Sequence, residues 1–182
     1  MSVLALDIDA ASVAEARKVI KGLPSVSVEL ADATNLELDE PADVVVLLDV
    51  LEHVEDDVAF LRHLGNLLAP GGQMVIKVPS IPSLHNTLDE AVGHFRRYDR
   101  KALASALNRG GFDSPQIWAF NAVGIIGWWV NGRLLKRVHP PEDHISAFDR
   151  LIPVLRKVEQ VCRPPIGLSL FAVASKPGSW PQ

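Results

Sequence analysis

The sequence is poor in the residues that build disulfide-bonded and metal-rich proteins. Cys162 is the one cysteine among its 182 residues, so an internal disulfide cannot form. This cysteine belongs to no Cys-x-x-Cys pair and to no Cys/His cluster, so the sequence predicts no metal site. A chain of this kind is expected in a reducing, cytoplasmic compartment.

Long apolar runs and a strong positive charge are also absent. The longest apolar runs, such as Val44 to Leu48, are far shorter than the roughly 20 residues that cross a membrane. The N-terminal residues have no basic lead-in and include Asp7 and Asp9, which argues against a signal peptide. The formal net charge of −4 argues against a nucleic-acid-binding protein.

The sequence does contain enough apolar material for one core. Apolar residues make up 48% and charged residues 22%, which is ordinary for a globular protein, so we expect residues 1–182 to form a single domain. The acids are concentrated in residues 1–60, which hold 14 acids and 3 bases, mostly at the ends of apolar runs. These acids either lie in solvated loops or form a site whose carboxylates accept hydrogen bonds.

Strands and helices are predicted to alternate along the chain. Apolar and β-branched runs predict strands at 3–6, 26–30, 43–48, 73–78, 114–120 and 168–174. Capping signals and helical spacing predict helices at 12–21, after Asp56 or Asp57, and at 100–109, 122–137 and 146–162. Residues 79–98 fit neither pattern, and a loop of that length is usually functional or mobile. The alternation predicts an α/β fold with a mostly parallel sheet.

Acidic residues follow three of the predicted strands. Asp7, Asp32 and Asp49 lie at or just after strand ends, and ligands of such sheets bind beyond the carboxyl ends of the strands. Asp7 is placed to accept hydrogen bonds from a ribose diol, and Asp32 from the amino group of an adenine, with Ile8 and Ala33 against the ring. A helix cap or a turn is the alternative role for each aspartate alone. Three acids in one topological position favour a nucleoside-type ligand.

Several stretches resemble the successive motifs of class I S-adenosylmethionine-dependent methyltransferases. They are VLALDID at 3–9, ADA at 31–33, DVVVLLDVLEHV at 43–54 and LLAPGG at 67–72, in the family's order and spacing. The stretch GHFRRYD at 93–99 is similar to a subgroup of small-molecule methyltransferases near those of quinone biosynthesis. The resemblance implies a Rossmann-like, doubly wound, mostly parallel sheet with an antiparallel last strand.

The resemblance also implies S-adenosylmethionine as the cofactor. Asp7 would hold its ribose hydroxyls and Asp32 its adenine amino group. Asp49 and Val50 would lie along its methionine end, and residues 51–53 would begin the wall between cofactor and acceptor. The full set of cofactor-binding residues that the resemblance implies is Asp7, Ile8, Asp32, Ala33, Asp49, Val50 and Leu51.

One part of the family pattern has no counterpart in the sequence. The family's glycine-rich turn should lie about 15–25 residues before Asp7, so we expect the first βα unit to be missing. Three interpretations stay open. The chain is a fragment or has a misplaced start, or it is a shortened fold compensated by, for example, a homodimer. Alternatively, it is a degenerate form without activity that serves as an interaction or oligomerisation module.

Methyl transfer from a sulfonium needs mainly positioning and a desolvated pocket. A general base helps when the acceptor is a hydroxyl or a phenol. The candidates for the catalytic side chain are His53, His94 and Tyr98, with His85 as a further histidine of the long loop. A helix end for His53 and a surface position for the loop histidines are the structural alternatives. Arg96 and Arg97 either bind an anionic group of the substrate or form a solvated turn.

Residues 121–166 are predicted to form a helical insertion before the last strand. The segment 122–137 is apolar, contains two adjacent tryptophans and ends in basic residues. It is a membrane-surface helix serving a lipid-linked acceptor, a lid or dimer contact, or part of the core. We therefore expect a small-molecule or lipid-like acceptor. A nicotinamide-dependent oxidoreductase is disfavoured, because Tyr98 has Ala102 where a Tyr-x-x-x-Lys pair needs lysine.

Overall fold

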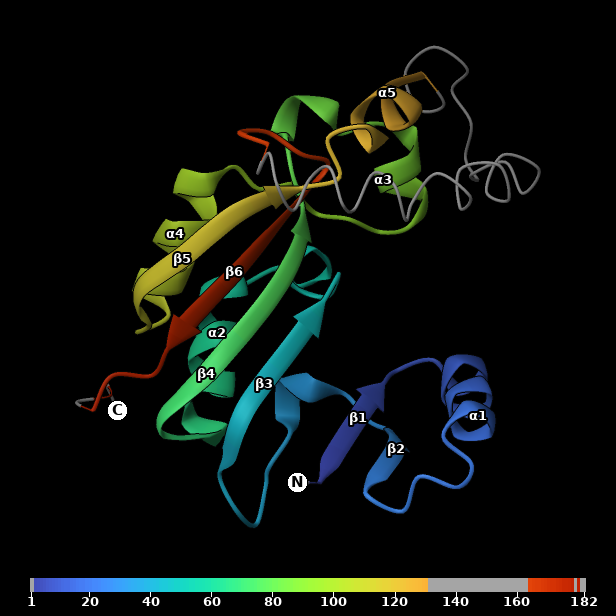
Figure 1. Cartoon of the computed structure of the whole chain (residues 1–182), viewed down its shortest axis with the longest axis vertical. Coiled ribbons are helices and arrows are strands. Elements are labelled where there is room, and N and C mark those ends of the chain that lie inside the picture. The colour runs from blue at the N-terminus through green and yellow to red at the C-terminus, as the bar shows by residue number, and fades with distance from the viewer. Residues whose placement is uncertain (1, 131–163, 179, 181–182) are drawn as a thin grey trace. The chain divides into compact units, whose positions relative to one another are not determined.

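The computed structural model describes residues 2–130, 164–178 and 180 (Figure 1). The chain divides into two compact units, Met1–Glu40 and Pro41–Gln182, and each is described by itself. The predicted helix at 146–162 and the end of the predicted helix at 122–137 lie outside the described residues. The single domain over 1–182 stays a prediction.

The first unit is a strand–helix–strand arrangement. The strands β1 (Val3–Asp7) and β2 (Val26–Leu30) are parallel and pair in register from Val3–Val26 to Asp7–Leu30. Between them lies the helix α1 (Ala10–Val19), and the short helix η1 (Ala33–Asn35) follows β2. The helix begins earlier than its Ser12 capping pattern predicts, because Asp9 is the N-cap and accepts a hydrogen bond from the Ser12 backbone N–H.

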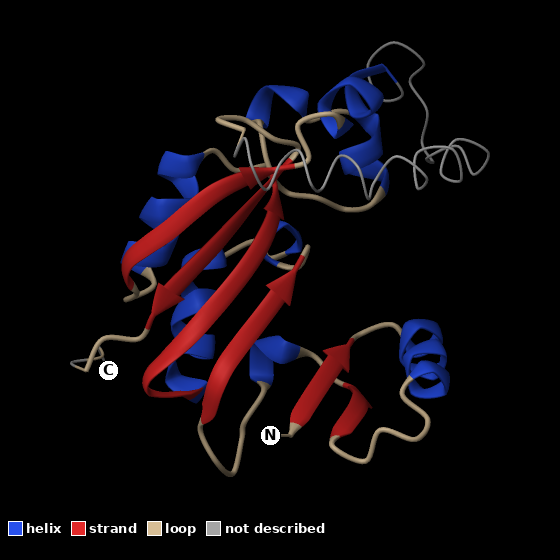
Figure 2. Cartoon of the chain, viewed as in Figure 1, coloured by secondary structure: helices blue, strands red, loops and turns tan. Residues whose placement is uncertain are grey.

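The second unit contains a four-stranded sheet in the order β3-β4-β6-β5 (Figure 2). The strands β3 (Ala42–Leu48) and β4 (Leu68–Pro79) are parallel. The strand β6 (Ser169–Ser175) runs antiparallel to β4 and to β5 (Asp113–Phe120). The predicted α/β fold, with a mostly parallel sheet and an antiparallel last strand, is therefore confirmed.

The start of β4 differs from the prediction. The strand begins at Leu68 rather than Gln73, since Ala42 pairs with Leu68 while Val44 pairs with Gln73. The intervening residues of β4 bulge out of the ladder, and Gly71 adopts a φ of 78° there, which glycine tolerates well.

Two helices pack on the sheet of the second unit. Helix α2 (Asp57–Leu67) contacts β4 and α4 (Arg100–Arg109), and α4 contacts β5. Both begin at aspartate N-caps, and their buried leucines include Leu61, Leu64, Leu103 and Leu107. The core of the unit lies between these helices and the sheet, as the apolar spacing of both helices predicts.

One face of β3 is not buried, although its sequence predicts a strand that is apolar on both faces. Val44, Val46 and Leu48 are 49%, 54% and 57% exposed, whereas Leu47 on the other face is 5% exposed. Alternate residues of a strand share a face, so these three form an exposed apolar row. Within the described residues β3 pairs with β4 alone, and β1 pairs with β2 alone.

The predicted loop 79–98 contains short helical segments. They are η3 (Pro82–Leu84) and α3 (Thr87–Ala91), and α3 begins with a capping box formed by Asn86 and Asp89. The other short helices are η2 (Leu51–His53), which follows β3, and α5 (Gly124–Trp129), which follows β5. Across the described ranges, no helix has the length and apolar content needed to cross a bilayer.

We predict that the N-cap of α4 contributes measurably to stability. The Asp99 carboxylate accepts a hydrogen bond from the Ala102 backbone N–H at 2.7 Å. Asp99→Ala should lower the free energy of unfolding by about 1 kcal/mol, whereas Asp99→Asn, which retains an acceptor, should cost much less. Urea denaturation measures both, and equal stability of the alanine variant and the wild type would show that the cap does not contribute.

We also predict that a valine-to-threonine substitution affects stability differently on the two faces of the sheet. In the 182-residue chain, Val46→Thr should change stability by less than about 0.5 kcal/mol because Val46 is exposed. Val78→Thr should cost roughly 1–3 kcal/mol, because Val78 is fully buried and the new hydroxyl loses water. Thermal or urea denaturation measures both variants. If they lost equal stability, the face of β3 that carries Val46 would not be exposed.

Candidate functional site

The first unit carries four of the residues predicted to bind a cofactor: Asp7, Ile8, Asp32 and Ala33. Asp7 ends β1, and its Oδ1 accepts a hydrogen bond from the Asp9 N–H at 2.8 Å. Asp32 is the N-cap of η1, where its Oδ1 accepts from the Thr34 N–H and hydroxyl. The hydrogen bond from the Thr34 backbone lowers the pKa of Asp32, so its carboxylate is ionised at neutral pH. Ile8 is 77% exposed.

In the second unit, Asp49, Val50 and Leu51 lead from β3 into η2. Asp49 has a φ of 54°, a left-handed conformation that aspartate adopts more readily than most residues. Its carboxylate forms an ion pair with Lys77 of β4, and its N–H donates to the Lys77 carbonyl oxygen at 3.0 Å. This turn directs the chain into η2, where Leu51 is fully buried.

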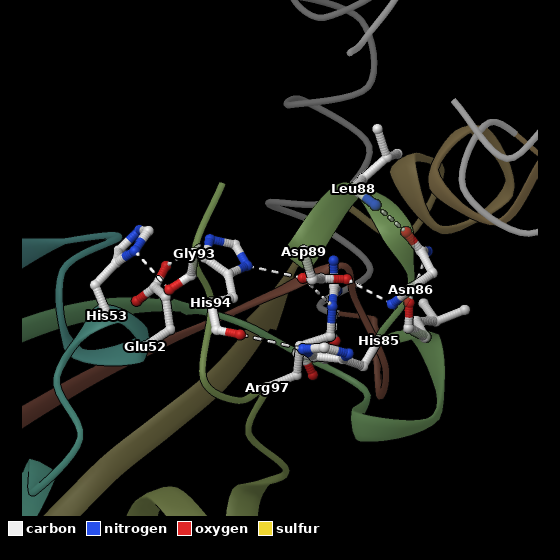
Figure 3. A network of polar contacts seen from close by, with 11 residues as sticks. Glu52, His53, His85, Asn86, Leu88, Asp89, Gly93, His94 and Arg97 are labelled. Carbon is white, nitrogen blue, oxygen red and sulfur yellow. Dashed lines mark hydrogen bonds and ion pairs between the residues drawn. The ribbon is translucent and has the colours of Figure 1, made fainter. Parts of the chain in front are cut away.

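The short helix η2 and the segment after α3 bring Glu52, His53 and His94 together (Figure 3). The imidazole rings of His53 and His94 pack edge to face with centroids 4.7 Å apart. The Nε2 atom of His94 lies 3.8 Å from Oε1 of Glu52, and Nδ1 of His53 lies 3.2 Å from the Gly93 carbonyl oxygen. Two of the three predicted catalytic residues therefore lie side by side.

His94 is held in place by a buried ion pair (Figure 3). Asp89 Oδ1 lies 2.7 Å from Nδ1 of His94 and accepts a hydrogen bond from Nε of Arg97 at 2.8 Å. Arg97 also donates to the Ser80 carbonyl oxygen, and Asn86 donates its N–H to the other oxygen of Asp89. Burial alone would raise the pKa of Asp89, but hydrogen bonds from His94 and Arg97, with the charge of Arg97, lower it to about 2.

Glu52 lies in a very different environment from Asp89. It is 0% exposed, and burial raises the pKa of its carboxyl to about 7. Within the described residues, neither of its carboxylate oxygens has a hydrogen-bond partner. Burial and the neighbouring His94 lower the pKa of His53. The site therefore combines an unpartnered buried carboxyl group with a largely neutral imidazole at neutral pH.

Tyr98 lies elsewhere in the second unit. Its hydroxyl donates a hydrogen bond to Asp57 at 2.8 Å, and the residue is 2% exposed. Burial, with the hydrogen bond to Asp57 and its negative charge, raises the pKa of the Tyr98 hydroxyl well above its ordinary value. Arg96 forms an ion pair with the same Asp57 at 3.0 Å. A catalytic role for Tyr98 stays a prediction, and this geometry favours a positioning role.

Arg97 fits neither of the roles considered from the sequence. It is buried, its guanidinium is engaged by Asp89 and Ser80, and the Trp128 ring of α5 stacks over it at 4.6 Å. Sequence reasoning therefore missed the structural importance of Asp89 and Arg97, as well as the isolation of Glu52. The signal that was available is local: Asp89 completes the capping box of α3 three residues after Asn86.

Comparison with known proteins gives the site a family context. A family model described as a methyltransferase domain matches residues 2–116. A probable S-adenosylmethionine-dependent methyltransferase of Mycolicibacterium smegmatis is 28% identical over 127 residues, which are 68% of this chain and 48% of that protein. A ubiquinone biosynthesis O-methyltransferase of Caulobacter sp. is 53% identical over 36 residues, 20% of this chain and 14% of that protein. The chain thus spans about half the length of the first relative and less of the second.

A solved structure shows the same fold. Phosphoethanolamine N-methyltransferase 2 of Haemonchus contortus, in complex with S-adenosyl-L-methionine, aligns with a TM-score of 0.63 and 18% identity. The alignment covers 97% of this chain and 43% of that chain. At this identity the likeness supports the Rossmann-like fold alone. Since the family model matches well over half of the residues, the chain belongs to the methyltransferase domain family.

Proposed function

We propose that the chain transfers a methyl group from S-adenosylmethionine to a small-molecule or lipid-like acceptor. The observation that carries this proposal is the family match, which extends from β1 into β5 and includes every residue assigned a cofactor or catalytic role. The solved relative that aligns with the chain binds S-adenosyl-L-methionine, which supports the same cofactor here.

The cofactor roles assigned to Asp7 and Asp32 agree with their local chemistry. Both side chains are exposed, and each uses Oδ1 for its local turn in the described residues. A carboxylate has two oxygens with about four acceptor positions, so a local cap leaves capacity for a ligand. We assign the ribose hydroxyls to Asp7, the adenine to Ile8, Asp32 and Ala33, and the methionine end to Asp49 and Val50. Leu51 begins the wall between the cofactor and the acceptor.

We assign His53 and His94 to the acceptor side of the site, since their ring nitrogens are at least partly accessible to solvent. His53 is exposed, and the side chain of His94 is 11% exposed. They would promote loss of a proton from an acceptor hydroxyl, either as a general base or by binding a further group that contacts the hydroxyl. Tyr98 would act by positioning Asp57 and Arg96.

A lipid-like acceptor agrees with the surface of α5. Ile126 and Trp129 are 68% and 46% exposed on this short helix. Apolar and tryptophan side chains of this kind can contact a lipid-like molecule or the surface of a membrane. Peripheral membrane contact through 122–137 and a homodimer remain predictions.

A second candidate function is favoured by the exposed apolar row of β3. Val44, Val46 and Leu48 lie on a strand with an unpaired edge within the described residues, and such edges readily pair with another chain. In this case the chain is an interaction or oligomerisation module without activity. Sedimentation analysis with and without S-adenosylhomocysteine distinguishes the methyltransferase from the inactive module. The inactive module should self-associate and should not bind S-adenosylhomocysteine.

We predict that the chain binds S-adenosylhomocysteine and that Asp7 contributes to this binding. Asp7→Asn keeps an acceptor for the Asp9 N–H but removes the charge, so we expect about tenfold weaker binding or more. Asp39→Asn is the matched control, since Asp39 is an exposed aspartate of the same unit that does not directly follow the carboxyl end of β1 or β2. Calorimetric titration compares the three proteins.

Two results of this titration would count against the proposal. No binding of S-adenosylhomocysteine to a folded wild-type chain would contradict cofactor use by this chain. Equal binding by the Asp7 and Asp39 variants would contradict the role of Asp7 and leave the family assignment intact.

A further inference from the structure

The Glu52 carboxyl group is buried without a hydrogen-bond partner, as are single ring nitrogens of His63 and Trp128 within the described residues. Glu52 stands out because it is 0% exposed and, among the described residues, both of its carboxylate oxygens lack a hydrogen-bond partner. Buried polar groups in folded proteins nearly always have a partner, and buried charges are paired or coordinate metals. The atoms around Glu52 therefore indicate what kind of ligand its carboxylate binds.

One histidine nitrogen faces Glu52 at a separation that fits two ligands of a shared metal ion. His94 Nε2 lies 3.8 Å from Glu52 Oε1, which is too far for a hydrogen bond. Two atoms each about 2.1 Å from a shared zinc ion lie roughly 3.4 Å apart in tetrahedral geometry, and further apart at wider angles. One donor atom from each of Glu52, His53 and His94 lies within 4.8 Å of the other two.

Both histidines are also oriented as metal ligands usually are. Nδ1 of His53 contacts the Gly93 carbonyl oxygen, and Nδ1 of His94 contacts the Asp89 carboxylate (Figure 3). Histidines that bind a metal through one nitrogen almost always donate the other N–H to a carboxylate or carbonyl. These contacts favour the tautomer with the proton on Nδ1 of each ring, and in that tautomer Nε2 keeps the lone pair that binds a metal.

We propose that Glu52, His53 and His94 bind one divalent metal ion of the zinc type. Two imidazole nitrogens and one carboxylate are a donor set found in catalytic zinc sites, where a fourth position stays open. Magnesium and calcium prefer sets made of oxygen atoms, so the two histidines favour zinc over them. His53 and Gly93 are exposed, so the ion can reach the site from solvent.

This site goes beyond the proposed methyl transfer and contradicts the absence of a metal site predicted from the sequence. Should an acceptor oxygen bind at the open position, it would lose its proton to solvent more readily. His53 and His94 would then promote loss of the acceptor's proton by binding the metal ion, rather than by taking up the proton themselves. The metal-binding experiment requires neither acceptor nor cofactor, so its result is independent of the titration with S-adenosylhomocysteine.

The test is direct metal binding by the 182-residue chain after dialysis against a chelator. We expect calorimetry with Zn²⁺ to show a site that Glu52→Gln and His94→Asn weaken more than about 100-fold. Asp89→Asn should weaken it about 10–100-fold, since Asp89 orients a ligand. Glu55→Gln is the matched control, because it makes the same chemical change at an exposed position three residues away, and its binding should be unchanged.

A wild-type chain that binds no Zn²⁺ would overturn the proposal. The same holds if the ion binds equally well to the Glu52→Gln and Glu55→Gln variants, since it then lies elsewhere in the chain. If circular dichroism shows that Glu52→Gln does not fold, His53→Ala decides instead. His53 is exposed, so its removal should spare the fold, and undiminished Zn²⁺ binding by this variant would also overturn the proposal.

Discussion

The candidate site of the second unit depends on the buried ion pair between Asp89 and Arg97. Either charge alone would be strongly destabilising at this depth, so each requires the other. Asp89 also completes the capping box of α3 and contacts His94, while Arg97 donates to Ser80 at the end of β4. This pair of charges, together with backbone hydrogen bonds such as Tyr98 N–H to the Pro79 carbonyl oxygen, fixes the segment 80–98 to the sheet and orients the His94 ring.

The other half of the site comes from the end of β3. The left-handed turn at Asp49, supported by the ion pair with Lys77, leads the chain into η2 and so positions Glu52 and His53. Phe95 donates its N–H to the Glu52 carbonyl oxygen, and His53 contacts Gly93, so the two halves are joined by backbone groups. The candidate site thus lies beyond the end of a parallel strand, where ligands of such sheets usually bind.

Local sequence patterns predicted much of this structure. The predicted bounds of β2 and α4 agree with the structure because apolar period and flanking glycines act over a few residues. The predictions were wrong where contacts between distant segments determine the structure. β4 begins at Leu68 because it pairs with β3 from there, and β3 buries one face rather than two. Glu52 and His94 come together through packing of segments about forty residues apart, so spacing in the sequence does not reveal them.

In this structure the Asp89–Arg97 pair holds the His94 ring with Nε2 directed at Glu52. Long-range ¹H–¹⁵N NMR of the histidine rings, recorded on chelator-treated protein, reports which nitrogen of each ring carries the proton. We expect His94 to carry its proton on Nδ1 and Asp89→Asn to disturb this preference, while His63 keeps its own signals. A His94 ring protonated mainly on Nε2, or one that does not respond to Asp89→Asn, would show that this ion pair does not orient the ring.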